Sequence, residues 1–356
     1  MHASCGFLPA DNPSERSAMI HGIFKSIQSI HRFEDRTATL WQARCWSVLW
    51  IIDRRRLEKI AKDLRDPEAL LGVLLQLPEN TARAARLALI FIDRESTTQP
   101  ADSRQAINAF RKAQSRDSFA CVVTKTPAAS SCYIVPPNVL KSNPMLSRAL
   151  EKLSHVWDWK RLYRTRDKIE HTLIRPSNIL CLSKELSSLW DQGLFALEPL
   201  DDDIDFVVYE MTEDGGETLP NQVYGARYRF HWLPRTSISG PESEVDFALH
   251  PEEILAKSLT NDTAPYRVLS QVSKKVLSFT GSRQGVGIEN GRNVDFFAED
   301  RALLPDRDLM QIRYDVLRIH ALNGGRGPEV YHNLIDPDAQ KQSGLLSWGR
   351  RAGMPR

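Results

Sequence analysis

The sequence lacks several features that would assign it to a common class of protein. It has five cysteines and no C-x-x-C pair, which argues against a disulfide framework and against a zinc knuckle. It contains no G-x-G-x-x-G motif and no P-loop lysine, so we expect no cofactor. Its apolar runs are far shorter than the roughly 20 residues that span a bilayer, so we expect no membrane association. The first residues lack the apolar core of a signal peptide, which predicts a cytoplasmic or nuclear protein that is not secreted.

The charged residues balance overall but not locally. The formal net charge is only +2. Residues 111–175 hold 13 Lys/Arg against 5 Asp/Glu, whereas residues 201–257 hold 4 basic against 13 acidic residues. A basic segment followed by an acidic one is consistent with a nucleic-acid face, and equally with two segments that pack together or present solvated surfaces. Charge alone therefore leaves the partner open.

Composition and periodicity predict a folded α+β protein. The chain is 42% hydrophobic and 26% charged, as is usual for a globular protein. In the N-terminal part, Asp66-Pro67-Glu68 supplies a helix cap, a proline at the first helical position and an acid in the first turn. We expect Pro78 to end that helix and Asn80 to cap the next one. Trp46 and Trp50 recur at helical spacing, which indicates core positions and not a ligand-binding box.

The C-terminal part changes to strands and ends in a helix. Alternating apolar residues predict strands at Phe206–Tyr209 and Tyr228–Leu233. Asp306 is placed to cap a final helix, which Asn323-Gly324-Gly325 ends. We divide the chain into a flexible tail (1–18), a helical N-terminal region (19–103), a central module (104–200), a C-terminal α/β region packed on that module (201–336) and a second flexible tail (337–356).

The central module carries the most specific pattern. The β-rich runs Phe119–Thr124 and Ser131–Val135 predict a hairpin, and Asn178–Leu189 predicts a strand that leads into a helix. Within them, the strings Cys121-Val122-Val123-Thr124 and Tyr133-Ile134-Val135-Pro136-Pro137, followed by Asn178–Pro199, resemble the ββα-metal (HNH) nuclease module of many fungal proteins. Two more strings, Phe230–Pro234 and Leu303–Asp306, extend the resemblance to roughly residues 104–325. The resemblance implies a central ββα fold.

The resemblance also places the family's site residues on this chain. The general-base histidine falls on Tyr133, the orienting asparagine on Asn178 and the metal-binding histidine on Ser187. A phenol has a reference pKa of about 10 and is a poor base near neutral pH. A serine hydroxyl is a weak neutral ligand for a divalent metal. We therefore expect that the nuclease centre is degenerate and that it holds no metal.

Two classes of function follow from this reading. The first, which we favour on sequence alone, is a metal-independent enzyme that acts on a small molecule by cyclisation, dehydration or isomerisation in fungal specialised metabolism. The second is a non-catalytic pseudonuclease that binds nucleic acid or a protein through the basic stretch Arg161–Arg175. A residual HNH endonuclease is a third and less favoured reading. Oligomeric state is left open.

The enzyme hypothesis names a specific set of residues. It takes Tyr133, Asn178 and Ser187 as catalytic groups around a closed apolar pocket. Asp191 follows Ser187 by four residues and shares its helix face. The substrate-binding residues that this hypothesis predicts are Cys132, Trp190, Asp191, His155 and His231.

Overall fold

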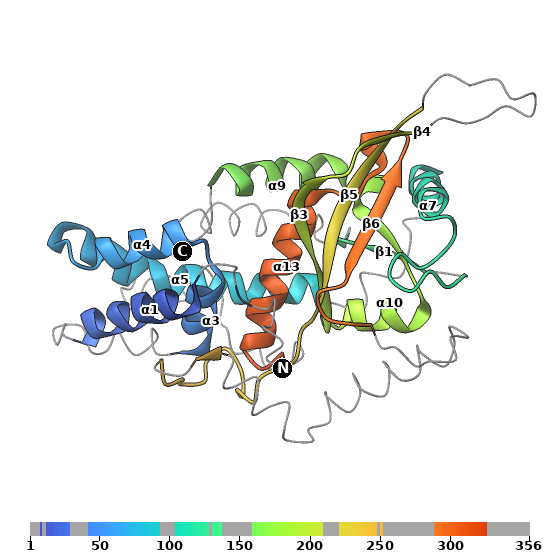
Figure 1. Ribbon diagram of the computed structural model, residues 1–356. Helices are drawn as coiled ribbons and strands as arrows, with labels where there is room; N and C mark the ends of the chain where they lie inside the picture. Colours follow the sequence, from blue (N-terminus) through green and yellow to red (C-terminus); the bar gives the residue numbers. More distant parts are fainter. Residues whose placement is uncertain are drawn as a thin grey trace, which may run out of the picture.

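The computed structural model describes residues 8, 12–28, 42–92, 104–127, 130–136, 159–208, 221–247, 250–251 and 288–325. Figure 1 shows the N-terminal helices at one end of the molecule, the main sheet at the other and helix α13 between them. The arrangement confirms the expected α+β class, with N-terminal helices, strands and a helix in the central module, and a C-terminal sheet with a final helix. No helix in these ranges combines the length and the apolar character needed to cross a membrane.

The N-terminal helices pack around a fully buried helix, α3. Trp46 and Trp50 of α3 are buried, as their spacing predicted. The C-terminal carbonyls of α3 are satisfied by a buried arginine of α1, because Arg16 Nη1 donates to the carbonyls of Leu49, Trp50 and Ile52 at 3.0, 3.2 and 2.9 Å. The helices of this region are α1 (Pro13–Gln28), α3 (Ala43–Ile51), α4 (Arg54–Asp63) and α5 (Pro67–Ile92).

Two predictions for this region were wrong. Helix α5 begins at Pro67 as expected, but it continues through Pro78 to Ile92. A proline removes one helical hydrogen bond, and here the packing of α5 against α3 and α13 outweighs that local preference. The loose tail expected over residues 1–18 is contradicted from Pro13 onward, because α1 begins there with Asn12 accepting the Ser14 amide at 3.0 Å.

The central module pairs strands that lie far apart in sequence. Strand β1 (Ser130–Tyr133) pairs antiparallel with β2 (Ile179–Leu182), and not with Phe119–Thr124 as predicted. The segment at 119–124 instead forms a tight turn, because the Cys121 amide donates to Thr126 O and the Lys125 amide donates to Cys121 O. The module also contains α7 (Arg104–Arg116), α9 (Trp159–Thr172), η4 (Pro176–Asn178) and α10 (Lys184–Asp191).

The main sheet is organised around its longest strand, β5. Strands β3 and β6 flank β5 in antiparallel register, and β4 pairs with its first residues. Tyr228 and Phe230 of β5 are buried, so this alternating set faces the core. The strands are β3 (Phe195–Asp203), β4 (Phe206–Val208), β5 (Asn221–Trp232) and β6 (Asn293–Ala298).

Helix α13 (Arg307–Leu322) joins the two ends of the molecule. Asp306 caps it as predicted, accepting the amides of Asp308 and Leu309 at 2.9 and 3.1 Å. Almost every residue after its first turn is buried, because α13 packs against α3, α5, α9 and β3. The short turn η5 (Arg301–Leu303) precedes it. The predicted linker at 96–103, the helix at Glu252–Leu259 and the tail at 337–356 lie outside the described residues.

Candidate functional site

Asn178 holds together the loops of the ββα module. It ends η4, immediately before β2, and its side chain is fully buried. Its Oδ1 accepts the Val135 amide at 2.8 Å, and its Nδ2 donates to the carbonyls of Val135 at 2.8 Å and Leu173 at 3.0 Å. These bonds fix the turn after β1 against the end of α9. Asn178 therefore uses its hydrogen-bonding capacity for structure.

Cys132 and Ser187 meet between β1 and α10. Cys132 Sγ donates to Ser187 Oγ at 3.0 Å, and Ser183 positions α10 by accepting the Leu186 amide at 3.3 Å. Burial raises the pKa of the Cys132 thiol to about 12 and outweighs the lowering effect of the Ser187 hydrogen bond. The thiol therefore stays protonated near neutral pH, and the pair is an uncharged thiol–hydroxyl contact.

Tyr133 points to the opposite side of β1, as the alternation of a strand requires. Its side chain is fully buried against Ala109, Ala113 and Ile179, with the Phe110 ring at 5.1 Å in an edge-on arrangement. Burial raises the pKa of the phenol to about 12, and its hydroxyl has no hydrogen-bond partner in the described part of the chain. The structure therefore does not bring Tyr133 and Ser187 into one pocket.

Trp190 and Asp191 lie at the end of α10, next to a buried arginine that the sequence analysis did not identify. Trp190 Nε1 donates to Tyr133 O at 3.0 Å. Arg313 of α13 donates to Ile134 O at 2.8 Å and to Trp190 O at 2.7 Å, and its guanidinium lies 3.8 Å from the Trp190 ring centroid. Burial lowers the pKa of Arg313 to about 9, against the raising effect of the Asp191 charge. No sequence motif marks Arg313, because its role arises only when α13 packs against the module.

His231 belongs to a different cluster. It lies on β5, where its Nε2 is 2.9 Å from Glu198 Oε2 and its ring stacks on Tyr314. Burial raises the pKa of Glu198, but the hydrogen bond with His231 and the charges of Arg318 and Arg229 outweigh it and hold that pKa below its usual value. His155, the remaining predicted site residue, lies outside the described residues.

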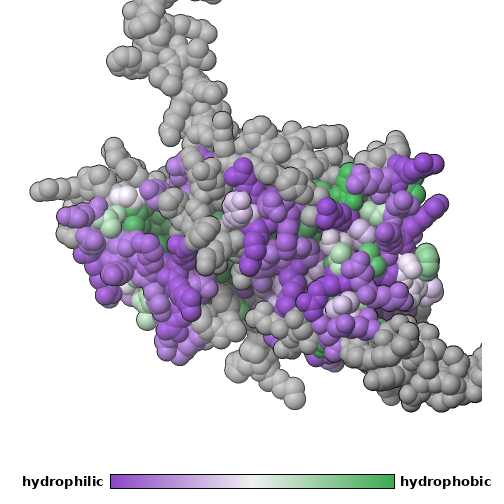
Figure 2. Space-filling model, turned by 90° about the horizontal axis from the view of Figure 1, so that it is seen from above, coloured by the Kyte–Doolittle hydropathy of each residue, from purple (hydrophilic) through white to green (hydrophobic). Residues whose placement is uncertain are grey.

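A second candidate site is a groove between α9, the middle of β3, the middle of β5 and the start of α13. It has a volume of about 680 Å³ and opens to solvent. Figure 2 views the molecule from above relative to Figure 1, which is the side where α9 lies. The described surface on this side is mainly hydrophilic. The cationic side chains that line the groove are Arg164, Lys168, Arg175, Arg301 and Arg307.

Buried Arg116 connects η4 and η5, two segments next to the groove. This buried side chain donates to Pro176 O at 3.1 Å, in η4, and to Leu303 O at 2.7 Å, in η5. On the floor, Lys168 Nζ forms ion pairs of 2.8 Å with both Asp306 and Asp308. The predicted basic stretch contributes Lys168 and two of the arginines, whereas Arg301 and Arg307 come from a part of the sequence with no local excess of basic residues. Only the fold shows that the two sets meet.

Comparison with known families places the ββα module. Residues 121–198 match the family model of the HNH endonuclease. This segment contains the turn at Cys121, β1, β2, α10 and the first part of β3, so it covers Tyr133, Asn178 and Ser187. Searches of curated proteins and of solved structures find no significant match. The chain therefore contains an HNH endonuclease domain at residues 121–198.

Proposed function

We propose that the chain is an HNH-fold protein that binds nucleic acid along the basic groove and does not cleave it. The groove carries this proposal. Five cationic side chains line it against two carboxylates, those of Asp306 and Asp308. A phosphodiester backbone binds to cationic grooves of this kind, chiefly through the release of counterions.

The former catalytic centre supports binding without cleavage. Tyr133 presents no accessible base, because its phenol is buried and its pKa is raised to about 12. The donors near Ser187 do not fit a divalent cation, since the Cys132 thiol stays protonated and donates its hydrogen to the serine hydroxyl. In the described part of the chain, no three His, Cys, Asp or Glu side chains are close enough to hold a metal.

The small-molecule enzyme has less support from the geometry. That hypothesis needs Tyr133 to reach a substrate in a closed apolar pocket. The Tyr133 side chain has no exposed surface and is packed against alanine, isoleucine and phenylalanine side chains. The hypothesis stays a prediction from the sequence.

The decisive experiment is a salt titration of nucleic-acid binding. Fluorescence anisotropy with a labelled 20-nucleotide oligomer, single-stranded and as a duplex, is measured between 50 and 300 mM NaCl. We expect log K to fall linearly with log salt concentration and gel assays with Mg²⁺, Mn²⁺ or Zn²⁺ to show no cleavage. Arg175→Glu reverses an exposed charge in the groove, and we expect it to weaken binding at every salt concentration.

A matched control reverses a charge far from the groove. Arg54 lies on α4 in the helical region and is 43% exposed, so Arg54→Glu is expected to leave binding unchanged. Binding that does not respond to salt, or that Arg54→Glu weakens as much as Arg175→Glu does, would contradict the proposal. Metal-dependent cleavage by the purified protein would contradict its second half.

A further inference from the structure

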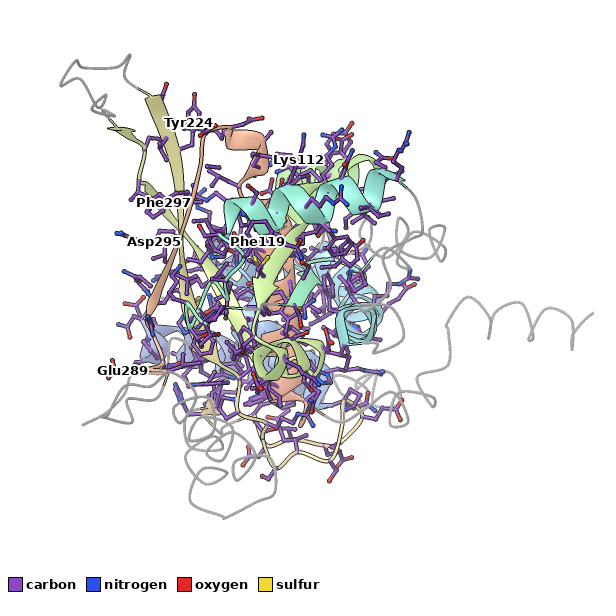
Figure 3. The ribbon with its side chains drawn as sticks, turned by 90° about the vertical axis from the view of Figure 1, so that its right-hand side faces the viewer. Lys112, Phe119, Tyr224, Glu289, Asp295 and Phe297 are labelled. Atoms are coloured by element: carbon purple, nitrogen blue, oxygen red, sulfur yellow. The ribbon has the colours of Figure 1, made fainter. Side chains whose placement is uncertain are left out.

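A second hollow shares Arg301 with the basic groove. This hollow has a volume of about 560 Å³ and is lined by Tyr224, Glu299, Asp300 and Arg301. Arg301 lines both spaces, so a ligand in the groove can extend past it into the hollow. Figure 3 shows Tyr224 near one end of β5, above Phe297 and Asp295 of β6.

Tyr224 and Arg301 lie against each other at the hollow. The Arg301 guanidinium carbon lies 5.2 Å from the centroid of the Tyr224 ring, and the Arg301 side chain is 61% exposed. Asp205 holds Arg301 in this position, because its Oδ2 lies 2.5 Å from Arg301 Nη2 while its Oδ1 accepts the Gly225 amide at 3.2 Å. Nucleic-acid bases stack on exposed arginine guanidinium groups and on aromatic rings.

The groove and the hollow differ in charge. Each therefore suits a different part of a nucleic acid. The groove has an excess of cations, as phosphates require. The hollow instead has a single cation, Arg301, and two exposed carboxylates, Glu299 and Asp300. Carboxylates repel phosphates but accept hydrogen bonds from the exocyclic amino group of a base such as cytosine.

From these contacts we infer that the protein binds single-stranded nucleic acid, with phosphates in the groove and one unpaired base stacked on Arg301. The amino group of that base donates to Glu299 or Asp300. A base inside a duplex is stacked and paired, so it cannot enter the hollow without being extruded. This inference rests on the proposed function and specifies its ligand: a single strand, with cytosine preferred over thymine because thymine has no amino group.

The test compares three fluorescein-labelled ligands by anisotropy at 100 mM NaCl: a 12-nucleotide dC oligomer, a 12-nucleotide dT oligomer and a 12-base-pair duplex. We expect the wild type to bind the dC oligomer about tenfold more tightly than the duplex, as expected for one stacked base. We expect the dT oligomer to bind with intermediate affinity. Arg301→Lys keeps the charge and removes the stacking plane, so it should abolish the advantage of single strands.

Two further variants separate the parts of the site. The double variant Glu299→Gln, Asp300→Asn keeps the size of both side chains, and asparagine can still cap η5 in place of Asp300. It should remove the preference for dC over dT and leave the preference for single strands in place. Arg175→Ala should weaken all three ligands by a similar factor, because it removes only a groove cation.

Each outcome has one meaning. Binding of the duplex as tight as that of the dC oligomer, or an unchanged single-strand preference in Arg301→Lys, would overturn the base site while leaving the proposed function standing. Equal binding of dC and dT by the wild type would overturn the role of the carboxylates. Failure of the wild type to bind any of the three ligands would overturn the proposed function and the base site with it.

Discussion

The basic groove takes only some of its residues from the ββα module, and it uses its polar residues in the opposite way from the ββα centre. In the centre, Asn178 and Cys132 direct their hydrogen bonds to neighbouring protein groups, and Tyr133 is closed off from solvent. In the groove, Arg175 and Arg301 are exposed. Buried polar groups thus hold the HNH segment together, whereas the charges of the groove come partly from that segment and partly from η5 and α13. A family match to the first region does not by itself state what the second region does.

The largest expected effect in the ββα centre is the loss of stability caused by Arg313→Ala. The variant removes a buried cation from between β1 and α10, takes from the Ile134 carbonyl the Arg313 donor and leaves the Trp190 carbonyl with only a backbone amide, that of Gly193. We expect a loss of about 3 kcal/mol in the free energy of unfolding, from the lost packing of a large buried side chain and the lost hydrogen bonds. Urea denaturation followed by tryptophan fluorescence measures it. A loss below about 1 kcal/mol would mean that Arg313 does not hold the ββα centre together.

A smaller effect is expected from the double variant Arg164→Ala, Arg175→Ala. Both side chains are exposed on the groove, so the free energy of unfolding should change by less than about 0.5 kcal/mol. Nucleic-acid affinity should fall about tenfold at 100 mM NaCl, and the salt slope should fall by about 2, one for each lost phosphate contact. An unchanged slope would place the ligand elsewhere.

Tyr133→Phe should change stability in the opposite direction. The Tyr133 hydroxyl is buried and has no partner in the described part of the chain, so it loses its hydration on folding without compensation. Its removal should stabilise the protein by about 1 kcal/mol and leave nucleic-acid binding unchanged. A destabilised variant would show that the hydroxyl has a partner. A variant that lost a small-molecule activity of the wild type would restore the enzyme hypothesis.

The smallest expected effect concerns pH. Because the pKa of Glu198 is lower in the folded state than in the unfolded state, its ionised form stabilises the fold above its ordinary pKa of about 4.5. This contribution is lost as the pH falls through the lowered value. The stability of the wild type should therefore decline more steeply between pH 5 and 3 than that of Glu198→Gln, as thermal unfolding at each pH can measure. Parallel declines would contradict the shift.

Local signals predicted the parts of the fold that local chemistry decides. Asp306 and Pro67 mark helix starts that the structure confirms, because capping depends on a few adjacent residues. The signals failed where distant packing decides. Pro78 lies inside a helix that tertiary contacts support, and β1 pairs with β2 and not with its neighbour in sequence.

The site was predictable to a similar extent. The match of residues 121–198 to the HNH family agrees with the strings that suggested it. Asn178 binds the Val135 backbone, and its catalytic role stays a prediction. Tyr133 and Ser187 lie on opposite sides of β1 because side chains alternate along a strand and α10 packs on the Cys132 side. No motif encodes the position of α10. The groove could not be predicted, because Arg301 and Arg175 meet only after the sheet and α13 have formed.

The position of α13 has a consequence for synthesis on the ribosome. The segment at 121–198 emerges from the ribosome well before Arg313, yet that side chain donates to the Ile134 carbonyl and lies 3.8 Å from the Trp190 ring centroid. Until α13 emerges, the nascent chain holds a ββα module with polar groups and the Trp190 ring left uncovered. Contacts of such long sequence separation slow folding and expose apolar surface to chaperones. The HNH segment is thus translated well before the contacts that complete it can form.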